Sequence, residues 1–234
     1  MNTIAARGQT EKPLVTICNE SRSVNLPAWV VDLESFRRWA DSDEFPEDAR
    51  VWYLQGQVWV DMSKEQVYTH VQAKTEIIVV LGGLVRAGDL GLSLADGAFL
   101  SHVDADISGI PDLIFASYKT LRAGRVRVIE GMERGYVELE GSPDMVLEVV
   151  SESSVKKDTV ILRQAYWEEG IREYWLVDVR EEPAKFEILR HSPKGYSSAR
   201  KQDGWLKSSV FGKAFQLNQK KNVVGHTEFR LAVR

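Results

Sequence analysis

One carboxylate stands inside a run of residues that otherwise suits the core of a sheet. Glu148 interrupts the apolar stretch Met145 to Val150, and a second apolar run, Tyr174 to Val177, follows a helical segment. A carboxylate inside a buried strand is costly unless something compensates it. The usual compensations are a metal ion, a cationic partner or a raised pKa. The chemistry of this chain therefore depends on which of them accompanies Glu148.

Two other carboxylates could share a site with Glu148. Asp144 lies on the same strand face, because side chains alternate along a strand, but four residues of strand separate the two by ~13 Å at about 3.3 Å per residue. That separation is too long for one ion. Asp112 opens another apolar run, Ile110 to Ala116, and would meet Glu148 if the two runs are neighbours in one sheet. Two hard oxygen ligands on adjacent strands suit Mg²⁺, which could activate water and stabilise the charge developing on a phosphodiester.

Each of these residues also has a plainer interpretation. Asp112 could be a turn aspartate that follows a proline. Glu148 could form a structural salt bridge, for which the nearby cations are Lys156, Lys157 and Arg163. Lys156 and Lys157 fall in the first turn of a predicted helix, where positive charge opposes the helix dipole. This placement favours an anionic partner close to one of the two lysines.

Three helices and several strands would position these groups. Helical spacing of apolar residues predicts helices over 27–40, 64–85 and 155–169. Ser63 is the expected N-cap of the second helix, and Gly170 is expected just beyond the end of the third. Extended segments are predicted as a hairpin over 51–62 that turns at Gln55-Gly56, and as strands over 110–116, 145–150 and 174–177.

The composition excludes several classes of protein. The 234 residues include 44% hydrophobic and 27% charged residues, which is ordinary for a soluble globular protein. The longest apolar stretch, Ile77 to Val85, is far shorter than the ~20 residues of a membrane helix. No signal peptide is recognisable, and the single cysteine, Cys18, forms no internal bridge. We therefore expect a soluble cytoplasmic protein.

The charge balance bears on nucleic-acid binding. The formal net charge is -4, which argues against a general nucleic-acid coat because sequence-independent affinity comes from neutralising phosphates. It does not exclude a local basic cleft or transient engagement. The chain shows no internal repeat and no break in composition. We expect a flexible N-terminal arm over 1–26 and a single domain over 27–234 that ends in a C-terminal β extension.

The central segment resembles a known family. The Pro111-Asp112 step, the apolar strand with Glu148 followed by Val-Val-Ser, and the run GIREYWLVD ending at Asp178 are similar to the Uma-two family of restriction endonucleases, in the PD-(D/E)xK nuclease superfamily. The resemblance covers roughly residues 28 to 190. It implies an α/β restriction-endonuclease-like core, with a mixed central sheet flanked by helices and extra β-hairpins.

The resemblance also implies an activity. It predicts a divalent-metal-dependent endonuclease that hydrolyses DNA phosphodiester bonds, with Asp112 and Glu148 as ligands of Mg²⁺ or Mn²⁺. DNA would be a transient partner, and a homodimer is the expected assembly by family analogy.

The motif lysine of this superfamily is missing from its usual places. Two residues after the acid the chain has Val150, and at the alternative position on the following helix it has Leu162. Gln57 stands where the family often has an early acid. We assign the water-positioning cation to Lys157, with Lys156 as the alternative. The alternative function is a catalytically degenerate nuclease fold that binds DNA or protein.

Overall fold

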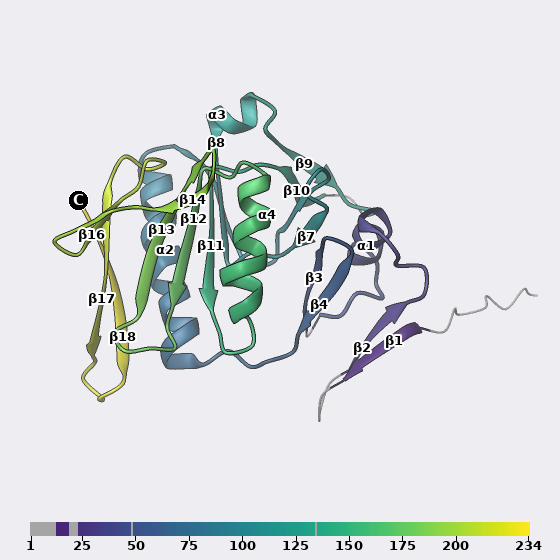
Figure 1. Ribbon diagram of the computed structural model, residues 1–234, viewed down its shortest axis with the longest axis horizontal. Helices are drawn as coiled ribbons and strands as arrows, with labels where there is room; N and C mark the ends of the chain where they lie inside the picture. Colours follow the sequence, from purple (N-terminus) through teal and green to yellow (C-terminus); the bar gives the residue numbers. More distant parts are fainter. Residues whose placement is uncertain (1–12, 19–22, 48, 134) are drawn as a thin grey trace, which may run out of the picture.

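A six-stranded sheet of mixed direction lies at the centre of the computed structural model, which describes residues 13–18, 23–47, 49–133 and 135–234 (Figure 1). β11 and β12 run parallel in its middle, and its other neighbouring pairs are antiparallel. In spatial order the strands are β14 (Gly195–Ser198), β13 (Lys185–Ser192), β12 (Glu173–Asp178), β11 (Met145–Val150), β8 (Leu113–Ser117) and β5 (Gly91–Ala95). The predicted α/β class with a mixed central sheet is confirmed.

Helices cover both faces of this sheet. α2 (Gln72–Ala87) lies on one face and α4 (Leu162–Glu168) on the other (Figure 1). All six residues of β11 are buried, and their side chains alternate between the two layers. Met145, Leu147 and Val149 pack in the cluster that includes α2, whereas Val146 and Val150 pack with α4. Glu148 therefore points into the α4 layer.

A second six-stranded sheet closes the α4 layer from outside. Its strands in spatial order are β4 (Gln57–Asp61), β3 (Arg50–Leu54), β7 (Ile107–Gly109), β6 (Phe99–His102), β10 (Tyr136–Gly141) and β9 (Val126–Glu130). Trp52 and Leu54 of β3 pack in the same apolar cluster as α4. The alternate residues, Val51 and Tyr53, face the cluster of α1 (Leu33–Ala40). The predicted hairpin with its Gln55-Gly56 turn is confirmed, and both turn residues have positive φ.

The C-terminal residues form a separate four-stranded sheet. Its strands are β15 (Lys201–Gln202), β16 (Trp205–Lys207), β17 (Ala214–Lys221) and β18 (Thr227–Val233). Phe215, Phe229 and Leu231 pack in the α2 cluster, so α2 is enclosed between this sheet and the central one (Figure 1). A short helix, α3 (Tyr118–Arg122), follows β8.

Both site-bearing helices contain a π-helical turn near their start that the sequence did not predict, η1 (Val67–Val71) before α2 and η2 (Lys157–Ile161) before α4. The second helix starts later than the predicted residue 64, whereas the third is helical from residue 155, as predicted. Ser63 is not an N-cap: its amide donates to Asp61 Oδ1 at 2.8 Å and its hydroxyl lies 2.8 Å from Ser153 Oγ. The end of the third helix is as predicted, because Gly170 has φ +73 and follows the last turn.

Part of the predicted N-terminal arm has regular backbone structure. β1 (Pro13–Cys18) pairs antiparallel with β2 (Ser23–Pro27). Residues 1–12 and 19–22 of the predicted arm lie outside the described residues. None of the described helices has the length and apolar character that crossing a membrane requires.

Asp144 joins β8, β11 and the start of β12, and we expect its loss to destabilise the fold. Its carboxylate accepts from the Ser117 amide at 2.7 Å and from Arg172 Nη1 at 3.0 Å. Asp144→Ala should lower the free energy of unfolding by about 1–3 kcal/mol, because a buried amide loses its acceptor. Arg172→Ala, a change on a half-exposed side chain, should cost less. Urea denaturation followed by circular dichroism measures both.

The same carboxylate should make stability depend on pH. Burial opposes its ionisation, but the hydrogen bonds from Ser117 and Arg172 hold the pKa of Asp144 below its ordinary value of 3.8. A lowered folded pKa gives stabilisation that is present above the unfolded pKa and is lost as pH falls through the folded one. The stability gap between the parent and Asp144→Asn should therefore shrink in acid below about pH 4. A constant gap would contradict this assignment.

Candidate active site

Asp112 and Glu148 converge because β8 and β11 are neighbours. Leu113 pairs with Leu147 in the antiparallel register, so the next position along each strand brings Asp112 opposite Glu148. Asp112 Oδ2 accepts from the Val149 amide at 2.7 Å, which fixes the carboxylate against β11. Both acids are buried and line one small cavity of about 20 Å³, roughly the volume that holds a single water.

Two of the three usual compensations for a buried carboxylate are present at Glu148: a cationic partner and a raised pKa. Tyr166 of α4 donates a hydrogen bond to its Oε1 at 3.0 Å, and Lys157 Nζ lies 3.8 Å from its Oε2. Burial raises the pKa of Glu148 well above its ordinary range; Lys157 opposes this shift, and the neighbouring acids Asp158 and Asp112 add to it. The third compensation, a metal ion, would act on the same carboxylate.

Lys157 is the cation that the fold brings to Glu148. Its ammonium lies 2.5 Å from Asp158 Oδ1 and 4.4 Å from the centre of the Trp52 ring, on strand β3. Burial alone would lower the pKa of Lys157, but Glu148 and Asp158 raise it, so the side chain stays charged. Lys156, by contrast, is exposed and its ammonium lies 5.8 Å from the Trp59 ring.

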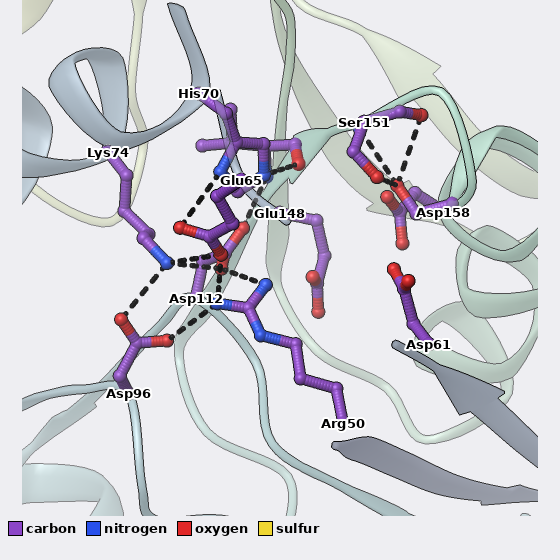
Figure 2. A network of polar contacts seen from close by, with 12 residues as sticks. Arg50, Asp61, Glu65, His70, Lys74, Asp96, Asp112, Glu148, Ser151 and Asp158 are labelled. Carbon is purple, nitrogen blue, oxygen red and sulfur yellow. Dashed lines mark hydrogen bonds and ion pairs between the residues drawn. The ribbon is translucent and has the colours of Figure 1, made fainter. Parts of the chain in front are cut away.

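Several site residues were not predicted from the sequence. Figure 2 shows Arg50, Lys74 and His70 grouped around Asp112 and Glu65, while Glu148 lies between this group and the acids Asp61 and Asp158. Two of them left a signal in the sequence. His70 lies near the first turns of the second predicted helix, and Lys74 falls on the face of that helix that otherwise carries apolar residues. Both side chains are buried.

The two π-helical turns each supply part of the site. η1 places His70 so that its Nε2 lies 2.6 Å from the Val149 carbonyl oxygen, and η2 carries Lys157 and Asp158. A π-helical turn adds a residue to the helical turn and so redirects the side chains around it, a feature often found at functional sites. The site is thus built where two helices start, on either side of β11.

Four acids line the cavity together with Arg50, Lys157 and His70, and these carboxylates could hold a divalent cation. Asp61, Asp112, Glu148 and Asp158 line it, and burial raises the pKa of Asp158 as it does that of Glu148. Hard carboxylate oxygens are the ligands that Mg²⁺ and Mn²⁺ accept. These residues therefore fit the ion that the sequence predicted, and Asp112 and Glu148 are among the acids that line the cavity.

A second arrangement of ligand atoms is less suitable. Among the described residues, Glu65, His70 and Asp112 offer ligand atoms within 4.8 Å of one another. The ammonium of Lys74, however, lies 2.9 Å from Glu65 and 3.4 Å from Asp112. With Lys74 and Arg50 beside it, this group already holds its cations, and the pKa of Glu65 falls to about 2: burial opposes the shift, whereas His70, Lys74 and Arg50 produce it.

The two positions at which the motif lysine is expected are occupied by buried apolar residues. Val150 and Leu162 are fully buried in the apolar cluster around α4, so neither position could hold a charge without loss of packing. Gln57 is exposed on β4 and does not line the cavity. Lys157 reaches the cavity from a different point on the same helical segment.

Comparison with known proteins decides the family. The sequence profile of the Uma2 family, described as "Putative restriction endonuclease", matches residues 33–219. The chain belongs to this family. A crystal structure described as "a putative nuclease belonging to DUF820" from Anabaena variabilis superposes with a TM-score of 0.56 at 14% sequence identity, over 78% of this chain and 91% of that one. No curated protein matches the chain.

The likeness to that structure concerns the fold. It agrees with the predicted restriction-endonuclease-like architecture, which is thereby confirmed. The family and the fold together point to a nuclease.

Burying the ionised carboxylate of Glu148 should lower the free energy of unfolding. Replacing Glu148 with glutamine, which has nearly the same shape and no charge, should therefore raise it. Because the folded pKa of Glu148 is raised, the ionised form costs free energy at high pH, and Lys157 keeps Asp158 as a partner in Glu148→Gln. We expect Glu148→Gln to raise the free energy of unfolding at about pH 8, and to raise it by less in mild acid, where Glu148 itself becomes protonated.

A matched control distinguishes this effect from any Glu-to-Gln change. Glu173 is also fully buried, but its carboxylate accepts from Trp175 Nε1, the hydroxyls of Ser208 and Ser209, and the Ser209 amide. Glu173→Gln should therefore destabilise the protein in the same denaturation assay. A loss of stability in Glu148→Gln as large as in Glu173→Gln would contradict the assignment.

Proposed function

We propose that this protein is a divalent-metal-dependent endonuclease that hydrolyses DNA phosphodiester bonds, with Asp112, Glu148 and Lys157 as its catalytic residues. One observation carries the proposal: in a chain of a nuclease family, two buried carboxylates and one buried ammonium meet in a single small cavity. Asp112 and Glu148 would hold Mg²⁺ or Mn²⁺. The ion would supply an activated water and stabilise charge on the phosphate.

The residues of the chain would prepare the site in distinct ways. The Val149 amide orients Asp112, and the Tyr166 hydroxyl orients Glu148, so both carboxylates are fixed before a ligand arrives. Lys157 is aimed at the cavity between Asp158 and the face of Trp52. From there its ammonium would donate hydrogen bonds to the attacking water or to the phosphate oxygen on which charge develops. In this role Lys157 would replace the absent motif lysine.

The remaining expectations follow from the resemblance and the composition. DNA would be engaged transiently, since the net charge of -4 gives no general attraction to phosphates. A homodimeric assembly, a cytoplasmic location and a single domain over 27–234 stay predictions.

Cleavage of supercoiled plasmid tests the activity. We expect nicking or linearisation with Mg²⁺ or Mn²⁺, none with EDTA, and none with Asp112→Asn or Glu148→Gln, because each variant lacks one charged ligand. Asp203→Asn, in the exposed turn between β15 and β16, is the control and should cut like the parent. Equal cutting by all variants would reveal a contaminating nuclease.

Substitution of each of the two adjacent lysines, Lys156 and Lys157, tests which of them is the catalytic cation. Lys157→Met should lower the cleavage rate by at least about 10²-fold, as expected when a group that stabilises the transition state is lost. Lys156→Met should change it by less than about threefold, since this exposed ammonium lies outside the cavity lining. Single-turnover cleavage of a labelled duplex measures both rates. The reverse order of effects would reassign the cation to Lys156.

The degenerate-module alternative gives a different pattern. The buried Leu162 at a motif position is the observation that favours it. A folded protein that shifts DNA in a gel but cuts none with Mg²⁺ or Mn²⁺ would support that alternative.

A further inference from the structure

Two cations lie against Asp112 in addition to any ion that it would bind. Lys74 Nζ is 3.4 Å from Asp112 Oδ1, and Arg50 Nη1 is 3.7 Å from the same oxygen. Both cations also contact Glu65 and Asp96 (Figure 2). We call these five residues the Lys74 cluster. Three carboxylates thus share two cations at the edge of the proposed metal site.

Lys74 lies closer to Glu65 and Asp96 than to Asp112, whereas Arg50 is equally far, 3.7 Å, from Asp96 and Asp112. Lys74 Nζ is 2.9 Å from Glu65 and 3.0 Å from Asp96, both shorter than its 3.4 Å separation from Asp112. Arg50 makes its shortest contact with Glu65. Asp112 therefore has the longest of the three contacts with Lys74, and its contact with Arg50 is as long as that of Asp96.

This distribution has a consequence for metal binding. An ammonium paired tightly with Asp112 would compete directly with a divalent cation for the same oxygen, and in a buried setting little water screens the repulsion between the two. Lys74 is buried and cannot retreat into solvent. Glu65 and Asp96 provide the only described carboxylates, other than Asp112, that contact its ammonium.

We infer that Glu65 and Asp96 draw Lys74 away from Asp112, and that this division of charge sets the affinity of Asp112 for a divalent cation. The inference rests on the proposed function, which makes Asp112 a metal ligand. Lys74 is a positioning residue in this scheme: it neutralises Asp112 when no ion is bound and moves fully onto Glu65 and Asp96 when one is. Asp96 is the acceptor that permits this movement.

Two single substitutions should change metal affinity in opposite directions. Lys74→Met removes the competing ammonium and should tighten Mn²⁺ or Ca²⁺ binding by about tenfold. Asp96→Asn removes an acceptor, so Lys74 shifts toward Asp112 and binding should weaken by a few-fold to about tenfold. Asn suits this position because Asp96 has φ 36, a conformation that Asn also adopts.

The double variant decides between this scheme and simple attraction by a nearby acid. If Asp96 acts through Lys74, the change that Asp96→Asn makes in the free energy of metal binding should be less than about half as large in the Lys74→Met protein as in the parent. If Asp96 only attracts the ion at a distance, its effect should be the same in both backgrounds. Isothermal titration of the full chain with Mn²⁺ and with Ca²⁺ gives the four affinities, and no cleavage is needed.

Stability provides an independent readout of the same scheme. In EDTA, Lys74→Met leaves Asp112 and Glu65 with fewer partners and should melt at a lower temperature than the parent, whereas saturating Mn²⁺ should restore most of the difference through binding to the folded state. Lys201→Met, on the exposed strand β15, removes the same charge elsewhere and should leave both melting temperature and affinity unchanged.

The outcomes separate this inference from the proposed function. No binding of either ion by the folded parent overturns the proposed function, and the inference with it. Binding by the parent with additive effects, or with tighter binding in Asp96→Asn, overturns the inference alone. If Lys74→Met does not fold, Asp96→Asn and Lys74→Arg decide: Lys74→Arg keeps the charge and should bind within about threefold of the parent, whereas Asp96→Asn should bind more weakly.

Discussion

The structure depends on the burial of one ionisable group, Glu148, in the middle of a fully buried strand. The cost of taking a carboxylate out of water would normally exclude it from such a position. Here a tyrosine hydroxyl and an ammonium, Tyr166 and Lys157, reach it from the two ends of one helical segment. The strand therefore can carry charge only because the segment after it, η2 and α4, packs on that face of the sheet.

The surrounding layers hold this arrangement in place from both sides. α2 and the C-terminal sheet pack on one side of β11, and α4 and the sheet that contains β3 and β4 pack on the other. The π-helical turns at the starts of both helices then direct polar side chains toward the end of β11 that carries Glu148. The apolar layers thus fix the position of β11, and the two π-helical turns bring polar side chains into a region that is otherwise apolar.

The charges of the site fall into two groups with different partners. On one side Arg50 and Lys74 share Asp112 with Glu65 and Asp96; on the other Lys157 lies between Glu148 and Asp158. Each candidate ligand of the proposed metal therefore has a cation beside it. Such a site can remain folded without an ion, and its affinity for one depends on how readily these cations give up Asp112 and Glu148.

The pairing of Asp112 with Glu148 could be predicted from the sequence up to one condition. Strand alternation and the rise per strand residue argued against Asp144, and Asp112 would meet Glu148 if the two apolar runs were neighbouring strands. The structure meets that condition, because β8 and β11 are paired. The hairpin at Gln55-Gly56 was predictable from a local pattern of residue types. The family followed from the resemblance of the central segment, and the mixed α/β sheet was what that resemblance implied.

The groups that surround Asp112 and Glu148 could not be predicted without the fold. Trp52, Lys74 and Asp96 come from segments far from Glu148 in the chain, and no local pattern relates them. The choice of Lys157 over Lys156 depends on a π-helical turn, which changes the direction of successive side chains without a recognisable sequence signal. Burial and long-range charge pairing are properties of the packed layers, and for that reason the cations beside Asp112 became visible only in the fold.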